Sequence, residues 1–252
     1  MYGQLIRDKK AVFFDLDGTI VDTEPLWAQG FETVLHEVAP SFSQDIKNIY
    51  AETGVSDHIK WENLKKAKHI KTDLSVEELV DKTNKAFLEL IENVEFFPAL
   101  GFWELAYFLK VKKEFPLALT TNSPQNVAQV ILDKLDIKET FNFYIFGDQV
   151  KNKKPNPEMY LTAAKKLNVE PKDVLVFEDS HCGSQASVAA GMDTVIIGEG
   201  FYDRKSYPKE IKKYFPDFRE LPTNLDMTYQ EAWEDYKQVV IKKYEKKGQV
   251  SP

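Results

Sequence analysis

The sequence predicts an α/β fold in which a doubly wound parallel sheet forms a core and carries an inserted all-helical domain. Three observations predict this class. Short apolar runs of strand length recur along the chain, helical patterns separate them, and one long helical stretch interrupts the alternation. With 252 residues, of which 43% are hydrophobic and 13% aromatic, the chain has enough apolar material for a packed core.

Five apolar runs are rich in β-branched and aromatic residues and are continuous rather than alternating. This pattern is typical of parallel strands that are buried on both faces. The runs lie at residues 11–14, 115–121, 143–146, 174–177 and 194–197.

Helical patterns separate these runs, at residues 102–112, 125–135, 158–167 and 183–190, and Gly191 closes the last of them. A strand that returns to the same sheet through a helix makes a right-handed crossover. The alternation therefore predicts a Rossmann-like sheet with helices on both faces.

The stretch from about residue 23 to residue 94 breaks this rhythm, because it shows helical patterns and no good strand candidate. We expect it to form a separate helical domain between the first and second strands. The core then consists of residues 1–22 and 95–252. The apolar positions that suggest the helices are Leu26, Phe31, Val34, Leu35, Leu79, Val80, Phe87, Leu88 and Ile91.

From about residue 217 to residue 252 the core part ends in a helical tail. Thr228 and Glu231 have the spacing of a capping box. We expect the helix that follows to pack on the core, since amphipathic stripes usually mark burial, and a helix that binds a partner is the alternative. Its apolar face consists of Trp233, Tyr236, Val239, Val240 and Tyr244.

The charge balance argues against some classes of partner. The chain has 33 lysines and arginines against 40 acidic residues, a net charge of -7. Nucleic-acid binding needs a basic patch, so we expect no such partner. No uncharged apolar run approaches the ~20 residues of a membrane span, so no membrane partner is expected.

The single cysteine, Cys182, and the lack of a signal-peptide pattern predict the cytoplasm. A monomer is the default expectation.

Polar clusters follow the predicted strands, and ligands of such sheets bind at these carboxyl ends. The first cluster is Asp15-Leu16-Asp17-Gly18-Thr19. Residues two apart in an extended chain point the same way, so one carboxylate can attack as a nucleophile while the other handles protons. Gly18 permits a tight turn and a close backbone approach to a ligand. A turn with two solvated acids is the alternative interpretation.

The second cluster, Thr121-Asn122-Ser123, precedes a helix, so its hydroxyl and backbone N–H groups suit a phosphate, although an ordinary helix N-cap has the same composition. The third contains Lys153 and Lys154 before a proline-stiffened loop that could aim a lysine into the pocket.

The fourth cluster is Glu178-Asp179-Ser180. Two adjacent acids after an apolar strand repel each other unless a cation lies beside them, and their oxygens suit Mg²⁺. An exposed loop pair, or a helix N-cap at Asp179 or Ser180, is the alternative.

The four clusters together, D-x-D-G-T, T-N-S, K-P and E-D-S-x-x-G, each after a strand and in this order, resemble the motifs of the haloacid dehalogenase superfamily. The resemblance covers about residues 12–198. The helical domain is similar to that family's helical cap.

The resemblance implies a Mg²⁺-dependent phosphatase that works through a covalent aspartyl-phosphate. Asp15 would be the nucleophile and Asp17 the general acid and then base. Thr121 and Lys154 would hold the phosphoryl oxygens, with phosphate contacts from Gly18, Thr19, Asn122 and Ser123. The Mg²⁺ ligands would be Asp15, the Asp17 backbone carbonyl and Asp179, with Glu178 a ligand or an outer neighbour. The substrate would be a small phosphate monoester: a sugar phosphate, a phosphoglycolate-like compound or a nucleotide-derived monophosphate.

Phosphomutases of the β-phosphoglucomutase kind are the closest alternative, because they share the four motifs and the cap. In them a histidine follows the first motif and an arginine lies in the specificity loop of the cap. Here Trp27 and Asp57 stand at those positions, and Thr19 stands where those mutases carry valine. These differences favour hydrolysis over phosphoryl transfer to a sugar.

A non-catalytic binding or regulatory protein on the same fold is the alternative of another class. Such a protein would be expected to have lost Asp15, Asp17 or Lys154, and this chain keeps all three.

Overall fold

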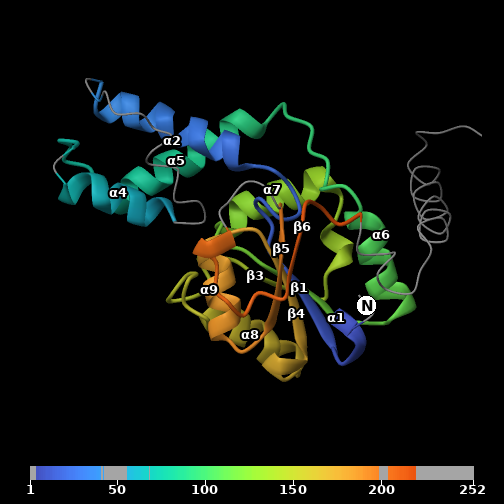
Figure 1. Ribbon diagram of the computed structural model, residues 1–252. Coiled ribbons are helices and arrows are strands. Elements are labelled where there is room, and N and C mark those ends of the chain that lie inside the picture. The colour runs from blue at the N-terminus through green and yellow to red at the C-terminus, as the bar shows by residue number, and fades with distance from the viewer. Residues whose placement is uncertain (1–3, 41, 43–55, 68, 199–203, 220–252) are drawn as a thin grey trace, which may run out of the picture.

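The computed structural model describes residues 4–40, 42, 56–67, 69–198 and 204–219 (Figure 1). Its core is a six-stranded, all-parallel sheet with the strand order β3-β2-β1-β4-β5-β6. This confirms the predicted fold class. The strands are β1 (Ala11–Phe14), β2 (Leu117–Thr120), β3 (Phe143–Ile145), β4 (Val174–Glu178), β5 (Asp193–Ile197) and β6 (Lys213–Phe215).

Both faces of the sheet are covered by helices, which explains the continuous apolar strands. Val12 and Phe14 pack into a cluster with residues of α6 (Phe102–Tyr107) and α7 (Gln125–Leu135). Ala11 and Phe13, which point the other way, pack with residues of α8 (Glu158–Leu167) and α9 (His181–Ala189). All four residues of β1 are 0% exposed, so the strand lies at the centre of the core.

Most element boundaries agree with the predicted ranges. The helices at 125–135 and 158–167 have the predicted ends, and a short helix α1 (Gln4–Arg7) precedes β1. Helix α6 continues as a π-helical segment, Phe108–Lys112. Helix α9 begins two residues before its predicted start, because the Ser180 hydroxyl caps it by accepting a hydrogen bond from the backbone N–H of Gly183.

Strand β6 was not predicted. It is a three-residue edge strand in which only Phe215 is buried, so it has no apolar run to mark it.

Three described helices follow β1 and precede β2: α2 (Glu24–Val38), α4 (Asp57–Lys66) and α5 (Val76–Ile91). We call them the helical insert; they lie together at one end of the molecule (Figure 1). Phe31 of α2 stacks on Trp61 of α4 at 4.1 Å, and the Trp61 indole N–H donates to the Thr83 hydroxyl at 3.0 Å. The described part of residues 23–94 contains no strand.

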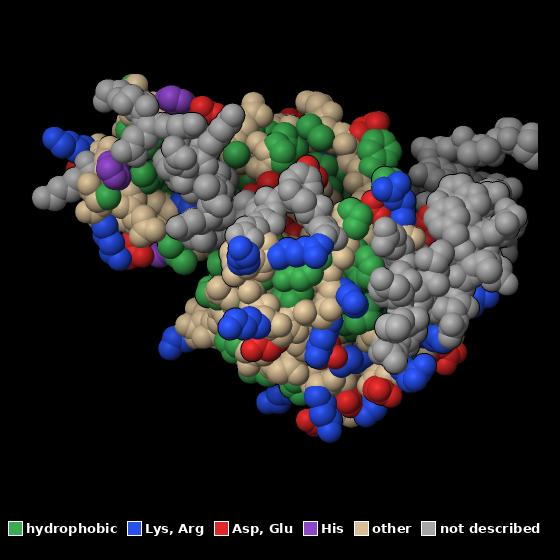
Figure 2. Space-filling view, in the orientation of Figure 1, with side chains coloured by type: hydrophobic (Ala, Val, Ile, Leu, Met, Phe, Trp, Pro, Cys, Tyr) green, Lys and Arg blue, Asp and Glu red, His purple; other side chains and the backbone are tan. Residues whose placement is uncertain are grey.

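The predicted capping box at Thr228 and the apolar face of the tail helix lie outside the described residues. Among the residues that are described, none of the helices has the length and apolar character needed to cross a membrane. On the face of the core shown in Figure 2, lysine and arginine side chains are interspersed with aspartate and glutamate.

Candidate active site

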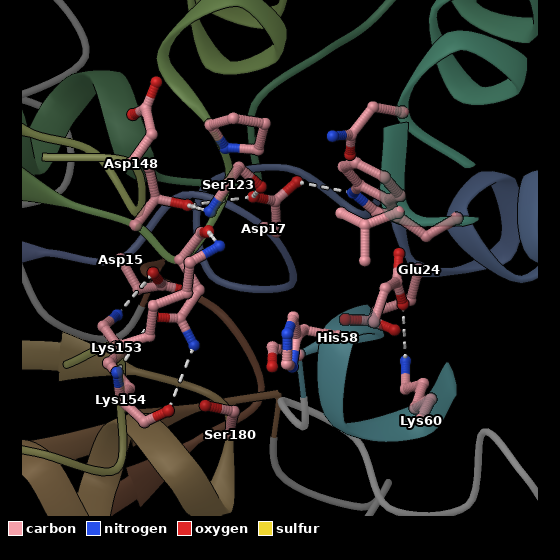
Figure 3. A pocket seen from close by; sticks show the side chains of 18 of the residues that line it. Asp15, Asp17, Glu24, His58, Lys60, Ser123, Asp148, Lys153, Lys154 and Ser180 are labelled. Carbon is pink, nitrogen blue, oxygen red and sulfur yellow. Dashed lines mark hydrogen bonds and ion pairs between the residues drawn. The ribbon is translucent and has the colours of Figure 1, made fainter. Parts of the chain in front are cut away.

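The predicted site residues meet at the carboxyl edge of the sheet, as the parallel topology requires. Asp15 directly follows β1, Thr121 follows β2, and Asp179 follows β4. Strand β1 lies between β2 and β4, so Asp15 stands between the other two. Asp15 and Thr121 line a cavity of about 280 Å³, together with other residues of the core and residues of the helical insert (Figure 3).

Lys154 is the buried cation of this site. Its ammonium group donates to Asp15 Oδ1 at 2.7 Å, to Glu178 Oε1 at 2.6 Å and to the backbone carbonyl of Thr120 at 2.9 Å. Burial lowers the pKa of Lys154, but the two carboxylates outweigh it and raise that pKa well above its ordinary value. The lysine is therefore charged at neutral pH and fixed beside the candidate nucleophile.

Three buried carboxylates, those of Asp15, Glu178 and Asp179, have oxygen atoms within 4.8 Å of one another. Burial raises the pKa of Asp15 well above its ordinary value, Lys154 opposes this, and Glu178 raises it further. Burial and the charges of Glu178 and Asp15 likewise raise the pKa of Asp179. One lysine is thus too little positive charge for three carboxylates, and an all-oxygen cluster of this kind fits a divalent cation.

The backbone at Gly18 passes close to the carboxylate of Asp179. Gly18 has a φ of +79°, and a Cβ atom at this position would lie 2.2 Å from Asp179 Oδ2. A side chain is therefore excluded between the first motif and Asp179. Thr19, the next residue, donates its hydroxyl to Asp179 Oδ1 at 2.9 Å.

Glu178 is held by protein donors on both carboxylate oxygens. Oε1 accepts from Lys154 and, at 2.8 Å, from the Tyr160 hydroxyl. Oε2 accepts from the Ser180 hydroxyl at 3.0 Å and from the backbone N–H groups of Asp179 and Ser180, both at 3.1 Å. These contacts support a role for Glu178 in orienting Lys154 and Asp179.

Asp17 is approached by donors from two sides. Oδ2 accepts from the hydroxyls of Ser123 at 2.7 Å and Thr121 at 3.1 Å, both on the core. Oδ1 accepts from the Thr23 hydroxyl at 2.6 Å and the Trp27 indole N–H at 3.2 Å, on the side of the helical insert. Figure 3 shows Asp17 between Ser123 on one side and the residues of the insert on the other.

The second motif also anchors the loop of the third. Asn122 Oδ1 accepts from the backbone N–H of Lys154 at 3.0 Å, and Asn122 Nδ2 donates to the Lys154 carbonyl at 3.4 Å. Helix α7 starts at Gln125 with Pro124 as its N-cap, one residue later than a Ser123 cap would give, which leaves the Ser123 hydroxyl directed at Asp17.

Several residues that line the cavity or contact Asp17 were not identified as site residues from the sequence. Thr23 and Trp27 lie four residues apart, so the first turns of α2 place both beside Asp17. This spacing after the first motif is the signal that could have found them. Glu24 and Lys60 of the insert also line the cavity, but a lone charged residue in a helix gives no comparable signal. Lys153, which belongs to the third cluster, lines the cavity as well.

The half-buried Glu24 makes stability depend on pH. Burial raises its pKa from 4.5 to about 7, with Lys60 opposing and Asp17 adding to the rise. Between these values the folded state keeps a proton that the unfolded state releases, so the free energy of unfolding falls as pH rises through this window. Glu24→Gln cannot ionise and should gain stability over the wild type between pH 5 and pH 8, by at most about 3 kcal/mol.

Denaturant unfolding of both proteins at the two pH values measures this difference. Glu32→Gln, an exposed acid on the same helix, is the matched control and should leave the pH dependence unchanged. Parallel pH profiles for Glu24→Gln and the wild type would contradict the assignment.

The parallel sheet with a clustered set of carboxylates, a buried lysine and hydroxyls at its carboxyl edge defines an α/β enzyme with a candidate carboxylate nucleophile. The chain belongs to the haloacid dehalogenase-like hydrolases, whose family pattern matches residues 12–197. The resemblance predicted from the motifs is therefore confirmed, as is the prediction that the chain is a hydrolase.

Similar proteins include named phosphatases. A phosphorylated carbohydrates phosphatase of Thermotoga maritima is 35% identical over 188 residues, which cover 74% of this chain and 83% of that protein. A fructose-1-phosphate phosphatase of Escherichia coli is 31% identical over 188 residues, covering 74% and 95%. The structure of a β-phosphoglucomutase from Clostridium difficile has the same fold, with a TM-score of 0.71 at 23% identity, covering 92% and 99%. Both of these phosphatases are phosphoric monoester hydrolases, as predicted for this chain.

Proposed function

We propose that this protein is a Mg²⁺-dependent phosphatase that hydrolyses a small phosphate monoester through an aspartyl-phosphate on Asp15. The observation that carries the proposal is the buried arrangement of Asp15, Lys154 and Asp179 at the carboxyl edge of the sheet. Two of the named relatives are phosphatases acting on phosphorylated carbohydrates or fructose 1-phosphate, which supports a substrate of the sugar phosphate class. Phosphoglycolate-like compounds and nucleotide-derived monophosphates are the two other substrate classes to test.

A divalent cation held by Asp15, Asp179 and the Asp17 backbone carbonyl would supply the positive charge that lets a carboxylate approach a phosphate dianion. Lys154 contributes a second fixed charge, at 2.7 Å from Asp15. Phosphoryl transfer depends mainly on positioning and charge stabilisation, and these groups provide both.

The chain's own residues then carry two steps. In the first, a carboxylate oxygen of Asp15 forms a bond to phosphorus, the bond to the leaving oxygen breaks, and Asp17 gives that oxygen a proton. In the second, Asp17 takes a proton from a water whose oxygen attacks phosphorus, and the bond to Asp15 breaks. The products are an alcohol and inorganic phosphate, and both aspartates return to their initial states.

The helical insert supplies the wall of the cavity that faces the core, through Glu24, Asp57 and His58. We propose that residues 23–94 act as a cap domain that selects the alcohol part of the substrate. The core of residues 1–22 and 95–252 then carries the chemistry.

A panel of phosphate monoesters tests the proposal directly. Sugar phosphates, phosphoglycolate and nucleoside monophosphates are assayed for phosphate release, first with Mg²⁺ and then with EDTA. We expect release of phosphate that depends on Mg²⁺. Absence of release from every ester, or equal rates in EDTA, would contradict the proposed function.

Asp179→Asn is expected to raise the Mg²⁺ concentration that gives the half-maximal rate, because a charged oxygen ligand is lost. A titration of activity against Mg²⁺ measures this. Asp173→Asn is the matched control, since Asp173 pairs with Lys10 at the amino end of β4, the opposite edge of the sheet. An unchanged metal dependence in Asp179→Asn would remove Asp179 from the site.

A further inference from the structure

Trp27 joins the helical insert to the carboxylate of Asp17. Its indole N–H donates to Asp17 Oδ1 at 3.2 Å, and its side chain is 9% exposed. The ring stacks on Phe87 of α5, with centroids 3.8 Å apart and an angle of 11° between the planes. Two helices of the insert therefore fix the direction of this N–H bond.

The donors around Asp17 differ in what they can do. The hydroxyls of Thr23, Thr121 and Ser123 can rotate and act as donor or acceptor, whereas an indole N–H can only donate. A protonated carboxyl oxygen is a poor acceptor, so the indole favours an arrangement in which Oδ1 stays unprotonated. The partners of Oδ2 are two hydroxyls of the core, which can turn to accept.

We infer that Trp27 is a positioning residue for Asp17: from the helical insert, its N–H holds Oδ1 so that Oδ2 is the oxygen that carries the proton exchanged with substrate and water. The inference rests on the proposed phosphatase function. Thr23 cannot replace Trp27 in this role, because its hydroxyl rotates. The stacked indole presents its donor in one direction.

The consequence is a requirement for Trp27 that depends on the leaving group. A poor leaving group, such as the alkoxide of a sugar phosphate, needs a proton from Asp17 as its bond to phosphorus breaks. An activated aryl leaving group needs little such help. A residue that merely stabilises the insert would affect both kinds of substrate equally.

Trp27→Phe separates these roles, because it keeps an aromatic ring against Phe87 and removes the indole N–H; the loss of ring volume that accompanies it is the same in the control variant below. The rate of leaving-group release in a single turnover is measured with Mg²⁺ for an activated aryl phosphate and for a sugar monophosphate. We expect the sugar phosphate rate to fall about 10-fold or more, a part of the 10²–10⁴ that general acid catalysis supplies. The aryl phosphate rate should stay within about 2-fold of the wild type. KM, measured separately at steady state, should change little for either substrate.

Trp61→Phe is the matched control. Trp61 is a fully buried tryptophan of the same insert whose N–H also has a side-chain acceptor, the Thr83 hydroxyl, away from Asp17. This variant should lose stability in thermal unfolding without any preference between the two substrates.

Three results would overturn the inference: equal slowing of both substrates by Trp27→Phe, a rise in KM without a change in rate, or the same selective loss in Trp61→Phe. Failure of the proposed function gives a different result, because the wild type itself would then release no phosphate from either ester in Mg²⁺.

Discussion

Replacing Asp15 with asparagine should abolish turnover of an aryl phosphate in the presence of Mg²⁺, because an amide is not a nucleophile for phosphorus. The fold should survive the change. The amide oxygen of the introduced side chain still offers Lys154 an acceptor, and one of the three clustered carboxylates loses its charge. Phosphate release and thermal unfolding, measured on the same preparation, test both statements.

Asp22→Asn is the control for this experiment, since Asp22 lies in the same stretch and is exposed. It should retain the wild-type rate. A folded Asp15→Asn protein with near wild-type turnover would show that the covalent mechanism is wrong.

Asp17→Asn should slow both chemical steps, by ~10²–10⁴ if loss of general acid and base work is the main effect. The four donors around Asp17 determine how the amide fits. Its oxygen can accept from Trp27, and its NH₂ group can face the hydroxyls of Thr121 and Ser123, which are able to rotate. The variant should therefore fold normally.

With an activated aryl phosphate the first step of Asp17→Asn needs little acid help, whereas the second still lacks its base. The phosphoenzyme should then accumulate and appear in mass spectrometry as a ~80 Da adduct on the peptide that contains Asp15. Asp15→Asn, treated in the same way, should show no adduct. A rate close to that of the wild type, with no adduct, would contradict the assignment of Asp17.

The same chemistry separates hydrolysis from transfer. The wild-type enzyme should release inorganic phosphate steadily from a sugar monophosphate without a bisphosphate activator, as Trp27, Asp57 and Thr19 predict. Interconversion of sugar phosphate isomers faster than phosphate release would favour the mutase alternative instead.

The core of this fold could be predicted from the sequence because a strand that is buried on both faces requires a continuous run of apolar residues. Residues 11–14 have to be apolar throughout, and the aspartate that follows them has to lie at the carboxyl edge. The tight turn at Gly18 could also be predicted, because its positive φ and the nearby Asp179 exclude a side chain at this position. Strand β6 has no continuous apolar run and could not be predicted in this way, because two of its three residues are not buried.

The contacts of the site side chains were less predictable. Thr121 and Ser123 were expected to face phosphate, and the structure directs both hydroxyls to Asp17. These contacts join the ends of β1 and β2, which are more than 100 residues apart in the chain, so they are a tertiary effect. The raised pKa of Glu24 is likewise caused mainly by burial in the assembled cavity, which the sequence does not show.

Lys154 has a further consequence for the order of events. An ammonium group has three N–H bonds, and all three already have protein acceptors: Asp15, Glu178 and the Thr120 carbonyl. A phosphoryl oxygen can therefore reach this lysine only by exchange with one of them. In the proposed reaction Asp15 is the acceptor that would weaken, because its oxygen would lose negative charge as it bonds to phosphorus. In the proposed mechanism the ammonium group would thus turn to the phosphoryl oxygens as negative charge builds up there, and it would return to Asp15 when water breaks the bond between Asp15 and phosphorus.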